Sequence, residues 1–164
     1  DGLAPVGGYP GNDDAGTKLQ AALEPKKLNQ DMLNSAVFLK SHPLANGRMG
    51  ATGFCWGGGM VNNLATAAPA LDAGVVYYGA PPKDGIANIK APLMIHYAGM
   101  DKRINDMAPA YEEALKNAGV SFQAFTYEGV NHAFNNDTGK DRYNEPAAKL
   151  AWGRTLAFLK EKLG

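Results

Sequence analysis

The order of hydrophobic and polar positions divides the chain into alternating helical and extended segments. Apolar residues recur every three or four positions from Pro25 to Ser41 and from Pro146 to Leu163, which is the spacing of amphipathic helices. Short apolar runs lie between such segments, as expected of buried strands. The predicted helices are Pro25–Ser41, Trp56–Ala67, Asp106–Ala118 and Pro146–Leu163, and the predicted strands are Arg48–Phe54, Leu71–Tyr78, Pro92–Tyr97 and Val120–Tyr127. This alternation predicts the α/β fold class, with a mostly parallel sheet of about four strands and helices on both faces.

The two ends of the chain carry more local predictions. Residues 1–24 are rich in turn-forming residues, and the run from Gly7 to Asp14 predicts a loop. In the final helix, one face is expected to pack against the core: Ala148, Trp152, Thr155, Leu156, Leu159 and Leu163.

Three of the predicted strands are followed by residues that can carry out chemistry. Cys55 follows the first strand, Asp101 follows the third and His132 follows the fourth. Because the carboxyl ends of parallel strands meet at one edge of a sheet, we expect the thiol, the carboxylate and the imidazole to lie together. Nucleophile, acid and histidine occur in the chain order of the α/β-hydrolase triad, with Gly-x-Cys-x-Gly in place of Gly-x-Ser-x-Gly.

Each of these residue types has a physical role in such a site. Glycines around Cys55 permit a sharp turn from strand to helix that exposes the sulfur, and the positive end of the helix favours a thiolate. The backbone N–H of Trp56 can donate to a developing oxyanion. His132 can take the thiol proton and later return it to the leaving group. Asp101 can hold the imidazole in one tautomer and stabilise its charged form.

Simpler interpretations of the same residues remain open. A lone cysteine is often a small buried hydrophobic residue. Asp101 could cap a helix, although Asp106 is better placed to cap the next predicted helix, which leaves Asp101 free. The glycines at 57–59 could cradle a phosphate, but the Lys and Ser or Thr that follow the glycines of nucleotide-binding loops are missing here. His96 lies inside a strand and is expected to be a hydrogen-bonded core residue.

Composition and charge exclude several classes of function. The 164 residues include 16 Lys and Arg and 16 Asp and Glu, and this zero net charge argues against a nucleic-acid partner. One cysteine and three scattered histidines predict no disulfide within the chain and no metal site, and no cofactor is expected. No apolar run approaches the roughly 20 residues of a membrane span, so no membrane partner is expected. A single cysteine is compatible with a reducing cytoplasm, where we expect the protein.

The sequence resembles the dienelactone hydrolase family, the carboxymethylenebutenolidases. The resemblance runs through essentially the whole chain, and a cysteine in place of serine at this turn is a mark of that family. The motifs that carry it are Gly53-Phe54-Cys55-Trp56-Gly57-Gly58, Tyr77-Tyr78-Gly79, Asp101 and Asn131-His132-Ala133-Phe134. The resemblance implies hydrolysis of esters or lactones through a thioester, with Cys55 as nucleophile, His132 as base and Asp101 as the orienting acid.

The resemblance also implies that residues 1–164 are one amino-terminally truncated domain. The family has a larger α/β-hydrolase sheet, and this chain supplies counterparts of only its last four strands, the carboxyl-terminal half of the fold. Its first strand would then be an exposed edge, so we expect a homodimer, or pairing with the missing amino-terminal half. That half would carry the second oxyanion donor, a glutamate near the thiol and an arginine for the substrate carboxylate.

The expected substrate is a small-molecule ester or lactone. Family members place a basic residue shortly after the histidine, whereas residues 133–136 here are uncharged, and Arg103 or Arg142 could substitute. Tyr78, Arg103 and Phe134 are the candidate substrate contacts. The alternative is a chain without catalysis, either a half-domain that assembles or a reactive thiol that responds to oxidation.

Overall fold

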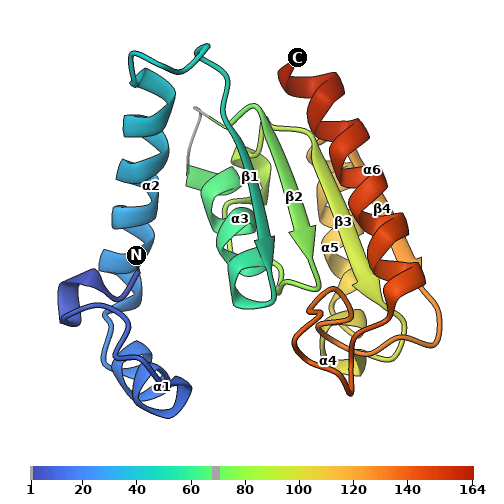
Figure 1. Cartoon of the computed structure of the whole chain (residues 1–164). Helices are drawn as coiled ribbons and strands as arrows, with labels where there is room; N and C mark the ends of the chain where they lie inside the picture. The colour runs from blue at the N-terminus through green and yellow to red at the C-terminus, as the bar shows by residue number, and fades with distance from the viewer. Residues whose placement is uncertain (1, 68–70) are drawn as a thin grey trace.

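Four parallel strands organise the structure, a computed structural model that describes residues 2–67 and 71–164. The strands lie side by side in chain order (Figure 1): β1 (Gly50–Phe54), β2 (Ala73–Tyr77), β3 (Leu93–Ala98) and β4 (Phe122–Tyr127). Every residue of β2 and β3 is buried, which explains why their sequences are apolar without alternation. The predicted α/β fold class with a parallel sheet is confirmed.

Helices cover both faces of this sheet. On one face, α6 (Glu145–Leu163) packs on β2, β3 and β4 through a core rich in aromatic side chains. On the other face, α3 (Trp56–Ala67) and α5 (Ala108–Asn117) pack on a mostly aliphatic core. Figure 1 shows α6 in front of the sheet and α5 behind it. The two cores fix the strands, so the loops at their carboxyl ends start from defined positions.

The remaining elements lie outside these layers. The helix α2 (Pro25–Ser41) packs on α3 at one side of the molecule. A single turn, α4 (Lys102–Asn105), follows β3, and the short 3-10 segments are η1 (Ala4–Val6) and η2 (Ile86–Asn88). Within the described part of the chain, no helix is long and apolar enough to cross a membrane.

The elements agree with the predicted ones except near the amino terminus. The bounds of α2 and α3 are those predicted, and the strands agree to within two residues. The loop predicted for the run from Gly7 to Asp14 is present up to Asn12, and α1 (Asp13–Ala21), which was not predicted, begins at its last two residues. Asn12 caps this helix by accepting the Ala15 N–H at 2.9 Å, and acidic residues fill its first turn. The surrounding glycines and prolines concealed this capping signal.

The buried face of α6 is also rotated from the predicted one. Trp152 and Leu156 are 44% and 52% exposed, so their predicted place in the core was wrong. The buried residues of α6 are Ala147, Ala148, Ala151, Thr155 and Phe158. Three alanines on this face let the helix approach β2 and β3 closely, and the larger side chains are left on its outer flank.

Candidate active site

The loops after β1, β3 and β4 meet at the edge of the sheet where the strands end, at the bottom of Figure 1. Cys55 directly follows β1 and precedes α3. Asp101 precedes α4, and His132 lies in the loop between β4 and α6. The sheet thus brings the three residue types to one edge, as expected from parallel strands.

Cys55 occupies a strained turn between β1 and α3. Its φ is 57°, in the left-handed region, which costs a non-glycine residue on the order of 1 kcal/mol. Its N–H donates to the Tyr77 carbonyl at 3.0 Å, and its side chain is exposed. Glycine is required at two neighbours, because a Cβ on Gly53 would lie 2.0 Å from the Gly57 oxygen and one on Gly58 would lie 2.7 Å from the Tyr77 oxygen. The predicted sharp, exposed turn is present.

Trp56 is the first residue of α3, so its N–H has no acceptor within its own helix. The N–H belongs to the residue directly after Cys55, at the positive end of a 12-residue helix. Its indole is 49% exposed. The described residues therefore place one backbone donor beside the thiol.

Asp101 and His132 are joined by a hydrogen bond of 2.5 Å between Oδ2 and Nδ1. Asp101 is buried and His132 is half-buried. The carboxylate accepts, so Nδ1 carries the hydrogen and Nε2 remains the basic nitrogen. An imidazole held in this way can exchange a proton with a thiol or a water through Nε2.

Asp101 also caps α4, which the sequence analysis assigned differently. Its Oδ1 accepts the Ile104 N–H at 3.4 Å, while Asp106 forms an ion pair with Lys102 at 2.6 Å. The expectation that Asp101 is free of a capping role was therefore wrong. A carboxylate has two oxygens, so one residue can cap a helix and orient an imidazole together.

Tyr78 connects the cysteine and the histidine. Its φ is 38°, its ring centroid lies 4.8 Å from that of His132, and its N–H donates to the His96 carbonyl at 2.7 Å. Burial, and after it the charge of the neighbouring Cys55, raises the pKa of the Tyr78 hydroxyl far above its usual range. The Tyr78 hydroxyl therefore stays neutral at neutral pH, while its ring lies against the ring of His132.

The other two candidate substrate contacts lie elsewhere. Phe134 is 0% exposed and its ring packs on Tyr78 and Tyr127. The ring is therefore part of the core and does not reach the surface. Arg103 is exposed on α4. The positive charge of Arg142 acts to lower the pKa of the Tyr78 hydroxyl, but this influence is smaller than the effect of burial.

Sequence analysis missed Asn105, which holds the loop that carries Asp101. Its Nδ2 donates to the carbonyls of Ala98 and Gly99 at 2.8 and 3.1 Å. Asn105 lies at the end of a single helical turn that the hydrophobic pattern did not show. The available signal in the sequence was an asparagine four residues after Asp101, which itself follows β3.

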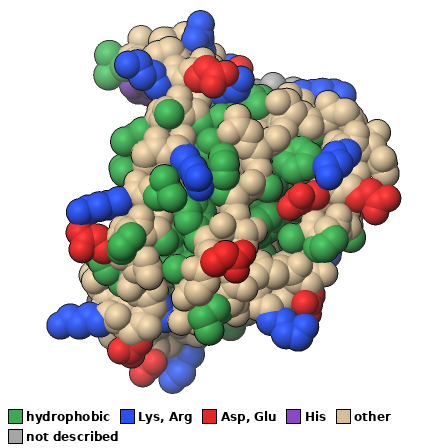
Figure 2. Space-filling model, turned by 90° about the vertical axis from the view of Figure 1, so that its right-hand side faces the viewer, with side chains coloured by type: hydrophobic (Ala, Val, Ile, Leu, Met, Phe, Trp, Pro, Cys, Tyr) green, Lys and Arg blue, Asp and Glu red, His purple; other side chains and the backbone are tan. Residues whose placement is uncertain are grey.

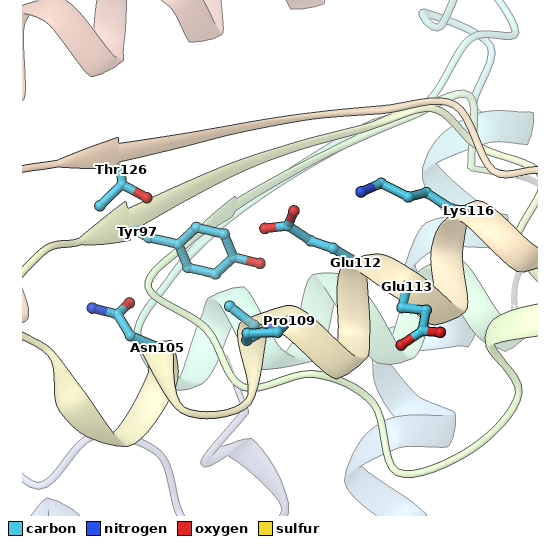
Figure 3. Close-up of a pocket in the computed structure, with 8 residues that line it drawn as sticks. Tyr97, Asn105, Pro109, Glu112, Glu113, Lys116 and Thr126 are labelled. Atoms are coloured by element: carbon cyan, nitrogen blue, oxygen red, sulfur yellow. The ribbon is translucent and has the colours of Figure 1, made fainter.

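Two pockets flank this edge of the sheet. One, of about 540 Å³, lies between the amino-terminal segment and Trp56, with the apolar side chains of Leu3, Leu23 and Leu28 in its wall. The other, of about 630 Å³, lies between α5 and the strands β3 and β4. Figure 3 shows Tyr97 and Glu112 directed into this second pocket, which contains none of the three candidate catalytic residues. The pocket beside Trp56 is not lined by these residues either, but Trp56 directly follows Cys55 in the chain.

Neither a metal centre nor a charged surface dominates the molecule. The described residues contain no group of three or more His, Cys, Asp or Glu placed to hold a metal ion. Figure 2 shows hydrophobic side chains exposed between scattered charged ones on one face.

Comparison with known proteins gives consistent results along nearly the whole chain. The model of the dienelactone hydrolase family matches residues 7–163. "Putative carboxymethylenebutenolidase" of Saccharolobus solfataricus is 34% identical over 154 residues, which are 90% of this chain and 59% of that protein. "Protein usf" of Aquifex pyrophilus is 36% identical over 159 residues, which cover 92% of this chain and 68% of that protein.

A solved structure agrees with these relatives. The crystal structure described as "Putative Dienelactone Hydrolase" from Klebsiella pneumoniae superposes with a TM-score of 0.72 at 30% identity. The match covers 80% of this chain and 60% of that chain. This chain thus spans between 59% and 68% of the length of these proteins.

Proposed function

Because the chain belongs to the dienelactone hydrolase family, a family of α/β hydrolases, we propose that it hydrolyses carboxylic esters or lactones with Cys55, His132 and Asp101. The observation that carries this proposal is the 2.5 Å hydrogen bond between His132 and Asp101 at the edge where Cys55 occupies its strained turn. A histidine oriented by a buried carboxylate, at the same edge of the sheet as an exposed thiol, supplies the residue types that nucleophilic catalysis requires.

In the first half of the reaction, the enzyme is acylated. His132 Nε2 takes the proton from Cys55 Sγ, and the thiolate attacks the carbonyl carbon of the ester. The carbonyl oxygen becomes an oxyanion that accepts the Trp56 N–H. The intermediate then collapses, the bond to the alcohol oxygen breaks and His132 gives its proton to the departing alcohol. The acyl group is left on sulfur as a thioester.

In the second half, water releases the acid. His132 Nε2 takes a proton from a water molecule, whose oxygen attacks the thioester carbonyl. The carbon–sulfur bond breaks, the carboxylic acid leaves and the thiol recovers its proton from His132. Asp101 stabilises the imidazolium in both halves and keeps its own charge throughout. The ring of Tyr78 limits rotation of His132 from the other side.

The pocket beside Trp56 supports a substrate with a small uncharged group. Its apolar wall favours burial of an alkyl or aryl substituent. Asp13 also lines it and already accepts a hydrogen bond from Tyr9 at 2.9 Å, so the pocket has acidic character and disfavours an anionic group. A carboxylate on the substrate would instead be placed toward Arg142, on the Tyr78 side.

The outer edge of β1 supports assembly with a second copy of this chain. Among the described residues β1 pairs with β2 alone, so its other edge presents free backbone donors and acceptors. Phe54 on this strand is 40% exposed, and Trp152 and Leu156 are exposed on α6. We expect sedimentation velocity at micromolar concentration to show a dimer or larger species, and a monomer would overturn the proposal.

The catalytic proposal is tested by hydrolysis of a short activated aryl ester, with Cys55→Ala as the matched control. Multiple turnovers that the variant lacks would support it. A single burst of product, one equivalent per chain, would show that Cys55 is acylated but not released. Such a burst would contradict the proposed catalytic turnover and would support the alternative, in which Cys55 is a reactive thiol. Equal rates for the two proteins would overturn the proposal altogether.

A further inference from the structure

A chain of buried polar side chains lies beneath the candidate active site, on the α6 face of the sheet. The Tyr77 hydroxyl lies 2.7 Å from Thr155 Oγ1, which lies 3.1 Å from His96 Nε2. His96 Nδ1 lies 3.0 Å from the Tyr127 hydroxyl, and Arg154 donates to that hydroxyl at 3.1 Å. The chain therefore joins β2, β3, β4 and α6, and it includes none of the three residues assigned to the reaction.

Arg154 favours one direction of donation along this chain. A guanidinium only donates, so the Tyr127 oxygen accepts from it and the Tyr127 hydrogen is free to point to His96 Nδ1. Nε2 of His96 then carries the ring hydrogen and donates to Thr155. Arg154 is itself held in place, because its guanidinium lies 4.0 Å from the centre of the Phe125 ring. Both ring nitrogens of His96 thus have partners, and the imidazole has one orientation.

His96 stays neutral inside this chain. Burial, assisted by the nearby positive charge of Arg154, lowers the pKa of His96 to about 3. Burial also raises the pKa of the Tyr77 hydroxyl to about 12, so it keeps its hydrogen. The hydrogen-bond pattern is therefore the same throughout the neutral pH range.

Two consecutive residues at the end of β2 connect His96 with the reacting groups. Tyr77 reaches His96 through Thr155, packs on Phe54 at 4.6 Å between ring centroids, and accepts the Cys55 N–H. Tyr78 donates its N–H to the His96 carbonyl and packs on the ring of His132. One strand end thus fixes the thiol on one side and the imidazole on the other.

We propose that His96 and Thr155 are positioning residues of the active site, which act by fixing Tyr77 and Tyr78. This inference rests on the proposed function. The opposite face of the sheet shows that packing a core does not require a polar network of this size. There, Tyr111 donates to Asn62 at 2.8 Å and Asn62 donates to the Ala80 carbonyl at 2.8 Å, so only two side chains take part. The α6 face instead joins five polar side chains into one chain. Such a network costs desolvation, and what it adds over an apolar core is a unique orientation.

The test compares Thr155→Val with Thr155→Ser and with Tyr111→Phe. The valine keeps the shape of the side chain and removes the hydroxyl, and the serine restores the hydroxyl. Tyr111→Phe removes a buried hydrogen bond of similar length from the opposite face. We expect Thr155→Val to lower kcat for the aryl ester about tenfold with little change in KM, because small displacements of reacting groups are costly. Thr155→Ser and Tyr111→Phe should stay within about twofold of the parent chain.

A second readout does not depend on ester turnover. The second-order rate of Cys55 alkylation by iodoacetamide should fall in Thr155→Val and not in Tyr111→Phe, at a temperature where all variants are folded. Equal kcat and alkylation rates in these two variants would overturn the positioning role. If the parent chain has no Cys55-dependent ester turnover, the proposed function fails, while the alkylation rates still decide whether Thr155 positions Cys55.

Discussion

The two faces of the sheet are built from different chemistry. The face under α3 and α5 is mostly aliphatic, with backbone in close contact where α3 begins beside the ends of β1 and β2. The face under α6 is aromatic and polar, and its hydrogen bonds cross three strands. Apolar burial stabilises a fold without fixing orientations, whereas hydrogen bonds fix orientations at a cost in desolvation. We infer that the first face mainly supplies stability and the second mainly supplies geometry.

The largest effect is expected where α3 meets the strand ends. Gly58→Ala places a methyl group 2.7 Å from the Tyr77 carbonyl oxygen, and neither backbone can move away freely. We expect a loss of about 2–3 kcal/mol in the free energy of unfolding by urea, together with loss of Cys55-dependent activity. Gly57→Ala is the matched control, because nothing lies within 4 Å of its added Cβ. A stable, active Gly58→Ala protein would contradict the close contact between α3 and β2.

The next effect concerns acid stability and belongs to the α6 face. The folded-state pKa of His96 is about 3, below the usual 6.5, so only the unfolded chain takes up this proton between those values. Stability is therefore complete above about pH 6.5 and falls as the pH drops toward 3, with a slope of up to about 1.4 kcal/mol per unit. Tyr77, Tyr127 and Arg154, which face His96, do not titrate in this window.

Urea unfolding between pH 7 and 4.5 measures this slope. His96→Gln removes the titrating group and should flatten the dependence, whereas Tyr111→Phe should leave it as steep as in the parent chain. The same slope in His96→Gln and the parent chain would show that other groups cause the acid sensitivity and that the imidazole is not a buried neutral base.

A smaller effect is expected from removing one buried hydroxyl on each face, and activity should distinguish the two variants although stability should not. Tyr77→Phe and Tyr111→Phe each remove one hydroxyl from a buried hydrogen bond, at 2.7 and 2.8 Å. Both should lower the free energy of unfolding by about 1 kcal/mol, as measured by urea titration. Only Tyr77→Phe should also slow ester hydrolysis, because the Tyr77 hydroxyl takes part in fixing the strand end beside Cys55. Equal activity losses would remove the distinction between the faces.

The smallest effect on stability is expected on the outer flank of α6. Leu156→Lys replaces an exposed leucine, so the free energy of unfolding should change by less than about 0.5 kcal/mol. The same change should weaken self-association in sedimentation velocity, since it places a charge on the exposed apolar flank of α6. Lys160→Gln, on the same helix, serves as a surface control. Unchanged association would exclude this flank from the interface.

Local signals were enough for much of the fold. Pro25 at a helix start and His42-Pro43 after its end fixed the bounds of α2, and short apolar runs located the strands. The candidate site was predictable in part, because Cys55, Asp101 and His132 each follow a strand and parallel strands bring such positions to one edge. The hydrogen bond between Asp101 and His132 agrees with that expectation.

Other features depended on contacts between distant residues. The exposure of Trp152 follows from where α6 lies on the sheet, and helical periodicity does not distinguish the two flanks of a long apolar stripe. Phe134 follows the histidine in sequence, yet its ring packs among tyrosines from β2 and β4 in the core. Asp101 both caps α4 and orients His132, and the sequence pattern predicted only the second of these roles.

The sequence alone determined the order of the elements, the family and the strand ends that carry chemistry, because periodicity and short motifs are local properties of a chain. Only the tertiary structure decided which side of α6 is buried and that Tyr78 lies against His132. It also decided that His96 joins three other side chains into one polar network with Arg154. These contacts join residues far apart in sequence, so their geometry is set when helices and strands close on a shared core.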